Sequence, residues 1–212
     1  MKKEQYEKKQ EIEKLKESAR ERYPDGDNLV FGAGSLNAKI LFVGTAPGKA
    51  EESEGLPIAG KPLSILESML KGLGVNMVDT YFTNLVLNNP GRKPSGSEIK
   101  RCFNRLSREI EIVDPLVVVT LGALPAKALT DVKSRFATFA KNPDSPFMFA
   151  KTKGKILEVE RNAIVTFCPK ELVGKNAVEL KKGSDLHWLF LSLRRAKKII
   201  STYEKILGEN NE

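Results

Sequence analysis

The chain has 212 residues, which is enough for one domain with a sizeable core and too few for two independent domains. Its composition, 41% apolar and 29% charged, is ordinary for a globular protein. No apolar run reaches the ~18 residues that a membrane-spanning helix needs, and the charged N-terminus has no apolar segment typical of a signal peptide. We therefore expect a cytoplasmic protein.

The formal net charge of +8 suits an anionic partner such as nucleic acid. The basic residues are spread along the chain, so a solvated, lysine-rich surface explains the charge equally well. The two cysteines, Cys102 and Cys168, indicate neither a disulfide framework nor a four-cysteine metal cluster. The single histidine, His187, argues against a histidine-rich metal site or a Ser-His-Asp triad.

The first half of the chain alternates helical and strand patterns. Residues 1–22 are helix formers of mixed charge with a thin apolar stripe, and they predict a surface helix that ends at "YPDGD". We expect residues 1–24 to form this N-terminal element and residues 25–212 the domain. The domain then begins with a buried strand, a helix and a second strand, over residues 39–43, 62–72 and 80–86.

The second half continues the alternation. Ser95 and Glu98 form a capping-box pattern that predicts the start of a helix running to about Ile112. The remaining elements are a strand over 116–122, a helix that begins in "ALPAKAL", a strand over 163–167 and a helix over 185–206. The segment "GKILEVE" (154–160) is a candidate hairpin strand.

Strands that alternate with helices, and that are short and apolar, predict an α/β fold. We expect a three-layer sandwich with a central four-stranded, mainly parallel sheet. Ligands of such sheets bind beyond the carboxyl ends of the strands. Three segments fall there: "GTAPG" (44–48), "TNLVLNN" (83–89) and "CPKELVGKN" (168–176).

Four segments, in order, carry a resemblance to a known family. They are "VFGAGSLNAKILFVGTAPGKAEESEGLPIAG", "TYFTNLVLNNPGRKPSGSEIKRC", "DPLVVVTLGALPAKALT" and "IVTFCPKELV". They resemble the motif regions of the uracil-DNA glycosylase superfamily, family 4 in particular, across roughly residues 29–200. The resemblance implies a uracil-DNA-glycosylase-like fold and DNA as the partner, and we expect a monomer with no membrane association.

Several positions depart from the family pattern. Thr45 stands where the family usually has a catalytic Glu, Ile58 where it has a stacking Phe, and Cys168 where it has a His. Asn88 replaces a cluster cysteine, so that only Cys102 matches a ligand of the family's iron–sulfur cluster. Because such a cluster needs about four thiolates, we predict no iron–sulfur cluster, no metal and no other cofactor.

The resemblance implies a base pocket. Asn84 matches the family's base-reading asparagine, whose amide offers a donor and an acceptor, although an asparagine that satisfies a turn is the alternative. The rest of the expected base-binding set is Gly44, Ala46, Pro47, Gly48, Ile58 and Cys168. For chemistry, Thr45 can position a water but cannot act as a general base. The nearby carboxylates, Glu51 and Glu52, can stabilise an oxocarbenium-like sugar or can be exposed loop charges.

The expected DNA contacts are cations and loop residues near the same edge of the sheet. Leu172 lies where the family inserts an apolar wedge into the base stack, and the alternative is a core leucine. The set is Gly60, Lys61, Arg92, Lys93, Lys170, Leu172 and Lys175. Solvated surface charge is an equal interpretation of the cations.

Two functions remain open at this point. One is a monofunctional DNA glycosylase that excises a deaminated or otherwise modified base, including a bulky one that Ile58 would accommodate. The other is a catalytically inactive protein of the same fold that binds DNA or a nucleotide. The retained Asn84 favours base binding, whereas the absent Glu and His favour inactivity.

Overall fold

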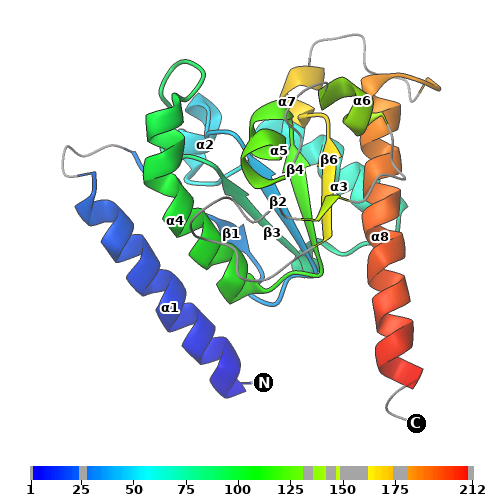
Figure 1. Ribbon diagram of the computed structural model, residues 1–212, viewed down its shortest axis with the longest axis horizontal. Coiled ribbons are helices and arrows are strands. Elements are labelled where there is room, and N and C mark those ends of the chain that lie inside the picture. The colour runs from blue at the N-terminus through cyan, green and yellow to red at the C-terminus, as the bar shows by residue number, and fades with distance from the viewer. Residues whose placement is uncertain are drawn as a thin grey trace.

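The computed structural model describes residues 2–23, 28–130, 136–141, 147–148, 162–173 and 181–209. It shows a three-layer α/β sandwich with helices on both faces of one twisted sheet (Figure 1). The candidate hairpin strand at 154–160 lies outside the described residues. The fold class predicted from the sequence is confirmed.

The four predicted strands form the parallel centre of the sheet. They are β3 (Thr80–Asn84), β2 (Ile40–Gly44), β4 (Val117–Leu121) and β6 (Asn162–Thr166), in that spatial order. Two antiparallel edge strands, β1 (Ala33–Gly34) and β5 (Phe147–Met148), flank them. Each edge strand is two residues long, which is too short to leave a periodic signal in the sequence.

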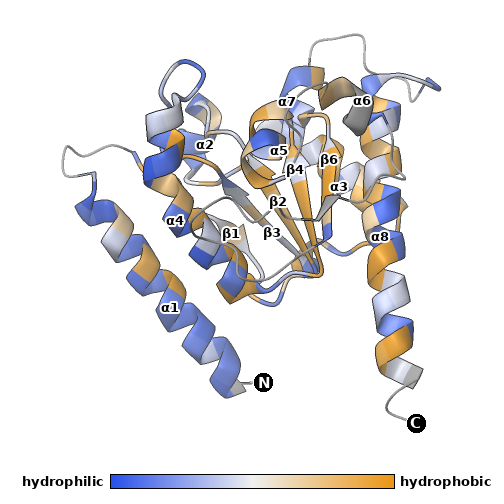
Figure 2. Ribbon diagram, viewed as in Figure 1, coloured by the Kyte–Doolittle hydropathy of each residue, from blue (hydrophilic) through white to orange (hydrophobic). Residues whose placement is uncertain are grey.

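Apolar side chains fill the space on each face of the sheet. Helices α3 (Gly60–Gly72) and α8 (Asp185–Glu209) cover one face, where they pack on Ile40, Phe42 and Val119. Helices α4 (Gly96–Val113) and α5 (Ala123–Leu129) cover the other face. Figure 2 shows β4 and β6 as mostly hydrophobic, as strands buried on both faces should be, whereas β3 (TYFTN) also carries polar residues.

The N-terminal helix α1 (Lys2–Glu21) lies outside the sandwich against α4 and is mostly hydrophilic (Figures 1 and 2). Ile12 and Ala19 are its buried apolar residues. Just beyond the helix, the Tyr23 hydroxyl lies 2.8 Å from Cys102 Sγ on α4. Burial and this contact raise the pKa of Tyr23 to about 12, so the phenol stays protonated at neutral pH.

Short elements complete the chain at the ends of the strands. They are α2 (Lys49–Glu54), a 3₁₀ turn (Met77–Asp79), α6 (Phe136–Ala140) and α7 (Pro169–Leu172). The predicted capping box is present at the start of α4, where Ser95 and Glu98 each accept a backbone N–H of the other. No helix within the described ranges is long and apolar enough to cross a membrane.

Candidate active site

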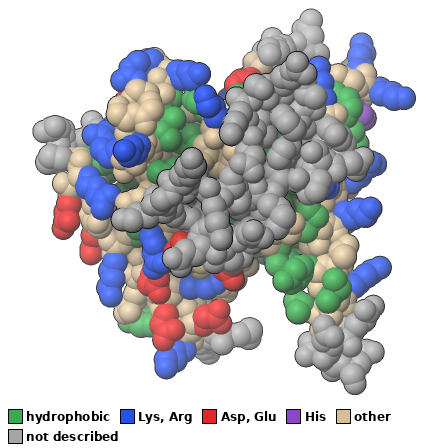
Figure 3. Space-filling view, viewed as in Figure 1, with side chains coloured by type: hydrophobic (Ala, Val, Ile, Leu, Met, Phe, Trp, Pro, Cys, Tyr) green, Lys and Arg blue, Asp and Glu red, His purple; other side chains and the backbone are tan. Residues whose placement is uncertain are grey.

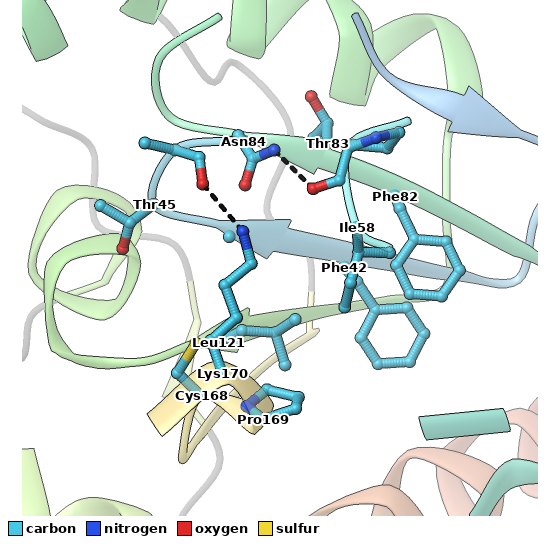
Figure 4. Close-up of a pocket in the computed structure, with 13 residues that line it drawn as sticks. Phe42, Thr45, Ile58, Phe82, Thr83, Asn84, Leu121, Cys168, Pro169 and Lys170 are labelled. Atoms are coloured by element: carbon cyan, nitrogen blue, oxygen red, sulfur yellow. Dashed lines mark hydrogen bonds between the residues drawn. The ribbon is translucent and has the colours of Figure 1, made fainter. Parts of the chain in front are cut away.

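A pocket opens at the carboxyl ends of β2, β3 and β4, where the fold class places ligands. It has a volume of about 40 Å³ and draws its lining from segments far apart in the chain (Figure 4). One wall is apolar: the Phe42 and Phe82 rings stack with centroids 4.8 Å apart, next to Ile58. The lining residues are Phe42, Gly44, Thr45, Ala46, Pro57, Ile58, Phe82, Thr83, Asn84, Leu121, Cys168, Pro169 and Lys170.

The turn after β2 and the end of β3 fit together as one unit. Gly44 and Asn84 are neighbours in the parallel register. A Cβ atom at position 44 would collide with Asn84 Oδ1, so a glycine is required for the amide to lie there. The backbone N–H groups of Leu85 and Val86 donate to the carbonyls of Gly44 and Thr45, at 2.9 and 3.2 Å, and hold the two segments together.

The Asn84 amide is buried and fixed in one orientation. Its Nδ2 donates to the carbonyl of Pro57 across 2.8 Å (Figure 4). The opposite orientation would place Oδ1 against that carbonyl, and two acceptors repel. The pocket therefore meets a ligand with the Oδ1 acceptor and the second Nδ2 hydrogen in defined places.

A buried arginine from α4 supports the backbone that carries Asn84. Arg105 is 5% exposed, and its Nη2 donates to the carbonyls of Asn84 and Leu85, at 2.6 and 3.3 Å. Its Nη1 donates to Thr83 Oγ1 and to the carboxylate of Glu109. The end of β3 is thus tied to α4 by charge-assisted hydrogen bonds, which are stronger than neutral ones.

Glu109 completes this network. The Tyr81 and Thr83 hydroxyls donate to its two carboxylate oxygens, at 2.8 and 2.7 Å. Burial and the adjacent carboxylate raise the pKa of Tyr81, which keeps the phenol protonated as a donor. Sequence reasoning missed both charged residues. Their signal was their spacing of four on one helix, where each directly precedes a buried apolar residue, Leu106 or Ile110.

A second ion pair joins the turn after β2 to α7. Lys170 Nζ lies 2.9 Å from Glu51 Oε1 and donates to the carbonyl of Ala46 at 3.2 Å. Glu51 also accepts the N–H groups of Gly48 and Ala59, at 2.8 and 3.3 Å. Burial alone would raise the pKa of Glu51, but Lys170 and the Gly48 N–H together hold it below its ordinary value.

The three residues expected to assist catalysis lie in different places. Thr45 lines the pocket. Glu51 is 4% exposed, behind Lys170, and is not an exposed loop charge. Glu52 accepts the backbone and side-chain amides of Asn89 and so anchors the loop after β3. Neither glutamate lines the pocket, because each is committed to holding a neighbouring segment.

The remaining base-site residues surround the turn. Ala46 also lines the pocket, while Pro47 is buried and Gly48 caps the start of α2. Cys168 lines the pocket just before α7. Burial raises the pKa of the Cys168 thiol, so it stays protonated and is a weak nucleophile at neutral pH.

The expected DNA-contacting residues divide into exposed and buried groups. Gly60, Lys61, Arg92 and Lys93 are exposed, and Lys175 lies outside the described residues. Arg92 is paired with Glu98 across 2.8 Å. Hydrogen bonds from Arg92 and Ser95 lower the pKa of Glu98 to about 2. Leu172 is 3% exposed and packs in the core, so in this conformation it does not project as a wedge.

The residues present do not fit an iron–sulfur cluster. The chain has two cysteines, and Cys102 Sγ already contacts the Tyr23 hydroxyl. Within the part of the chain that the structure describes, no group of three or more His, Cys, Asp or Glu side chains could hold a metal ion. A cluster needs about four thiolates, so no step of the chemistry below is routed through one.

Comparison with known proteins defines the class. A family model described as the uracil DNA glycosylase superfamily matches residues 31–187. The chain therefore belongs to that superfamily, as the motifs predicted.

Individual relatives point to one branch of the superfamily. The chain is 34% identical over 137 residues to the type-4 uracil-DNA glycosylase of Archaeoglobus fulgidus, covering 63% of this chain and 64% of that protein. It is 30% identical over 165 residues to the type-4 uracil-DNA glycosylase of Pyrobaculum aerophilum, covering 77% of this chain and 82% of that protein. It is 31% identical over 157 residues to the type-4 uracil-DNA glycosylase of Thermotoga maritima, covering 73% of this chain and 77% of that protein. The chain is thus family 4-like, and the alignment spans just under two-thirds of the Archaeoglobus protein.

The buried Arg105–Glu109 pair predicts a large loss of stability on breaking it. Arg105→Met leaves Glu109 buried without its counter-charge, which should lower the free energy of unfolding by about 3–5 kcal/mol. Arg105→Met combined with Glu109→Gln should recover part of the loss, because a neutral amide needs no counter-charge and its oxygen can still accept from one of the two hydroxyls. The matched control is Arg108→Met, an exposed arginine on the same helix, which should cost about 1 kcal/mol or less. Urea denaturation measures the free energy of unfolding of all three variants. Equal losses for Arg105→Met and Arg108→Met would contradict the stabilising role given to the buried ion pair.

The lowered pKa of Glu51 predicts how stability depends on pH. A carboxyl whose pKa is lower in the folded than in the unfolded state contributes stability above its unfolded value of about 4.5, and loses it as the pH falls through the folded value. The melting temperature of Glu51→Gln should therefore lie furthest below that of the wild type near pH 7. The difference should shrink below about pH 4. Glu54→Gln, at an exposed position on the same helix, should show no such pattern in thermal melts.

The cysteine arrangement predicts a protein without iron. Protein purified without added chelator should carry no iron above background in a colorimetric assay and should show no visible absorption band. Cys102→Ser should leave that result unchanged, since a hydroxyl can still pair with Tyr23. Stoichiometric iron that disappears in Cys102→Ser would refute the prediction.

Proposed function

We propose that this protein is a DNA glycosylase that hydrolyses the N-glycosidic bond of a deaminated pyrimidine, with uracil as the first candidate. The observation that supports this best is the fixed Asn84 amide in a pocket at the carboxyl ends of the strands. The relatives that the chain matches are named type-4 uracil-DNA glycosylases.

The orientation of the Asn84 amide favours one base edge. A uracil edge presents an N–H donor beside a carbonyl acceptor, which matches an Oδ1 acceptor beside an Nδ2 donor. Cytosine presents an acceptor beside an amino donor and would need the amide reversed. The Pro57 carbonyl opposes that reversal, so uracil is preferred over cytosine.

The pocket size also bears on the substrate. Ile58 does not open a large space, because the Phe42 and Phe82 rings occupy the same wall. At about 40 Å³ the cavity is small, and the flexible Lys170 side chain extends across it (Figure 4). These features favour a small pyrimidine over the bulky modified base that the substitution at position 58 suggested.

Charge at the pocket mouth can assist departure of the base. Breaking the bond leaves negative charge on the base, and an ammonium group held near it stabilises that charge. Lys170 supplies such a group two residues after Cys168, and Cys168 stands where the family has a histidine. In this proposal Thr45, which lines the same pocket, hydrogen-bonds the water that attacks the sugar.

The surface is compatible with a DNA backbone at the same end of the molecule. Figure 3 shows Lys and Arg side chains above the loop between β3 and α4, where Arg92 and Lys93 are exposed, and others along α8. Acidic side chains gather at the opposite end of this face. A cationic surface of this kind binds the phosphate backbone without regard to sequence.

A non-catalytic DNA-binding role is the second candidate. One observation favours it: the two glutamates nearest the pocket, Glu51 and Glu52, are engaged elsewhere and do not line it. Under this alternative, the pocket would still bind an extruded base. Binding without turnover would distinguish the two functions.

The test is an excision assay on a panel of duplexes. The duplexes carry uracil, hypoxanthine, hydroxymethyluracil or glucosylated hydroxymethylcytosine, and abasic sites are detected by alkaline cleavage. We expect excision of uracil. Asn84→Ala should lower kcat/KM by about 10- to 100-fold, which corresponds to losing a bidentate contact of ~1–3 kcal/mol. Asn104→Ala, an exposed asparagine on α4, is the control and should retain activity.

Two outcomes would reject the proposal or part of it. Binding of every duplex without any abasic product would leave the non-catalytic alternative. Excision that is unaffected by Asn84→Ala would remove the role given to that side chain.

A further inference from the structure

Among the described residues that line the pocket, Lys170 is the only lysine. It enters from α7, and its Nζ reaches the turn at Thr45–Gly48, between the apolar wall and the mouth (Figure 4). The side chain is 32% exposed, so a ligand at the mouth can touch it. A base that pairs with Asn84 would place its sugar at this mouth, because the amide lies at the buried end of the pocket.

The partners of Lys170 hold the amine in place and leave it able to react. Glu51 and the Ala46 carbonyl occupy two of the three ammonium donors, so among the described residues one donor remains for a substrate. The Glu51 carboxylate is itself fixed by two backbone N–H groups. A lysine in a pocket with a carboxylate at hydrogen-bond distance has both the nucleophile and the proton acceptor that imine chemistry needs.

We propose that Lys170 is the nucleophile of a second activity, an abasic-site lyase that acts on the product of base excision. The inference rests on the proposed function for its substrate: a 2-deoxyribose whose C1′ has become a free aldehyde. The Lys170 amine attacks C1′, the C1′–N bond forms, and the aldehyde oxygen leaves as water. The resulting imine joins the enzyme covalently to the DNA.

The neutral amine can form in two ways: by proton exchange with water, as on DNA that is already abasic, or as part of the first reaction. The base departs as an anion, and the Lys170 ammonium gives it a proton, which leaves the neutral amine beside the sugar. Glu51 can receive the proton that the amine loses on attacking C1′. No oxidant, reductant or metal is consumed.

Strand cleavage then follows by elimination. A proton leaves C2′ to the carboxylate or to water, the C3′–O bond breaks, and the 3′ fragment departs with a 5′-phosphate. Water hydrolyses the remaining imine and returns the free amine of Lys170. The overall change is the cleavage of one C–O bond with protons balanced by solvent.

Borohydride trapping tests the inference directly. The full-length protein is mixed with a duplex that already contains an abasic site, and sodium cyanoborohydride reduces any imine to a stable amine. We expect a covalent protein–DNA band, and tryptic mass mapping should place the adduct on the peptide that contains Lys170. Lys170→Arg, which keeps the charge but cannot form this imine, should reduce the band at least tenfold.

Two controls keep the outcome interpretable. Lys71→Arg changes an exposed lysine in the last turn of α3 and should retain the band. Thermal melting checks that Lys170→Arg is folded, and the adduct map in the wild type needs no variant at all. Absence of a trapped species on abasic DNA that the protein binds would overturn the proposal, as would an adduct mapped to another amine.

The abasic substrate separates this inference from the proposed function. Uracil excision without trapping would retain the glycosylase and reject the lyase. Trapping at Lys170 without excision of any base would retain the lyase and reject the glycosylase.

Discussion

The guanidinium of Arg105 is the interaction on which the site depends most. A buried cation is costly unless it is paired and hydrogen-bonded, and here Glu109, Thr83 and two backbone carbonyls accept from its two Nη groups, while its buried Nε has no partner among the described residues. The carbonyls belong to Asn84 and Leu85, so the same bonds that compensate for burying the charge also fix the end of β3. The position of the Asn84 amide therefore depends on a charge in α4 that does not line the pocket.

A second ion pair joins the first of the four sequence motifs to the last. Glu51 follows the turn after β2, and Lys170 comes from α7, more than a hundred residues later in the chain. Their ion pair holds the last motif against the first, and it places a cation where the pocket opens. This ion pair is why Glu51 is buried although its neighbours Ser53 and Glu54 are exposed.

The sequence predicted the fold well wherever the signal was local and periodic. The four parallel strands and helices α3, α4 and α8 follow from runs of apolar residues, and the Ser95–Glu98 cap followed from its spacing. The geometry of the candidate site was harder to predict from the sequence. Motif order brought Gly44, Asn84 and Lys170 to one edge of the sheet, but no local pattern could show that the Pro57 carbonyl fixes an amide 27 residues away. From the sequence, Leu172 and Glu51 could each be an exposed or a buried residue, because their burial depends on packing between segments that are far apart in the chain.

The short edge strand β1 has a consequence for the behaviour of the protein at high concentration. An exposed sheet edge offers unpaired backbone groups to any other extended chain, and long flat edges promote aggregation. Here β1 covers β3 with only two residues, and Gly34 has a φ of 130°, which turns the backbone out of the extended form at once. A second molecule that approached this side would find no straight strand on which to continue the sheet. The small segment therefore limits growth of the sheet from one molecule into the next.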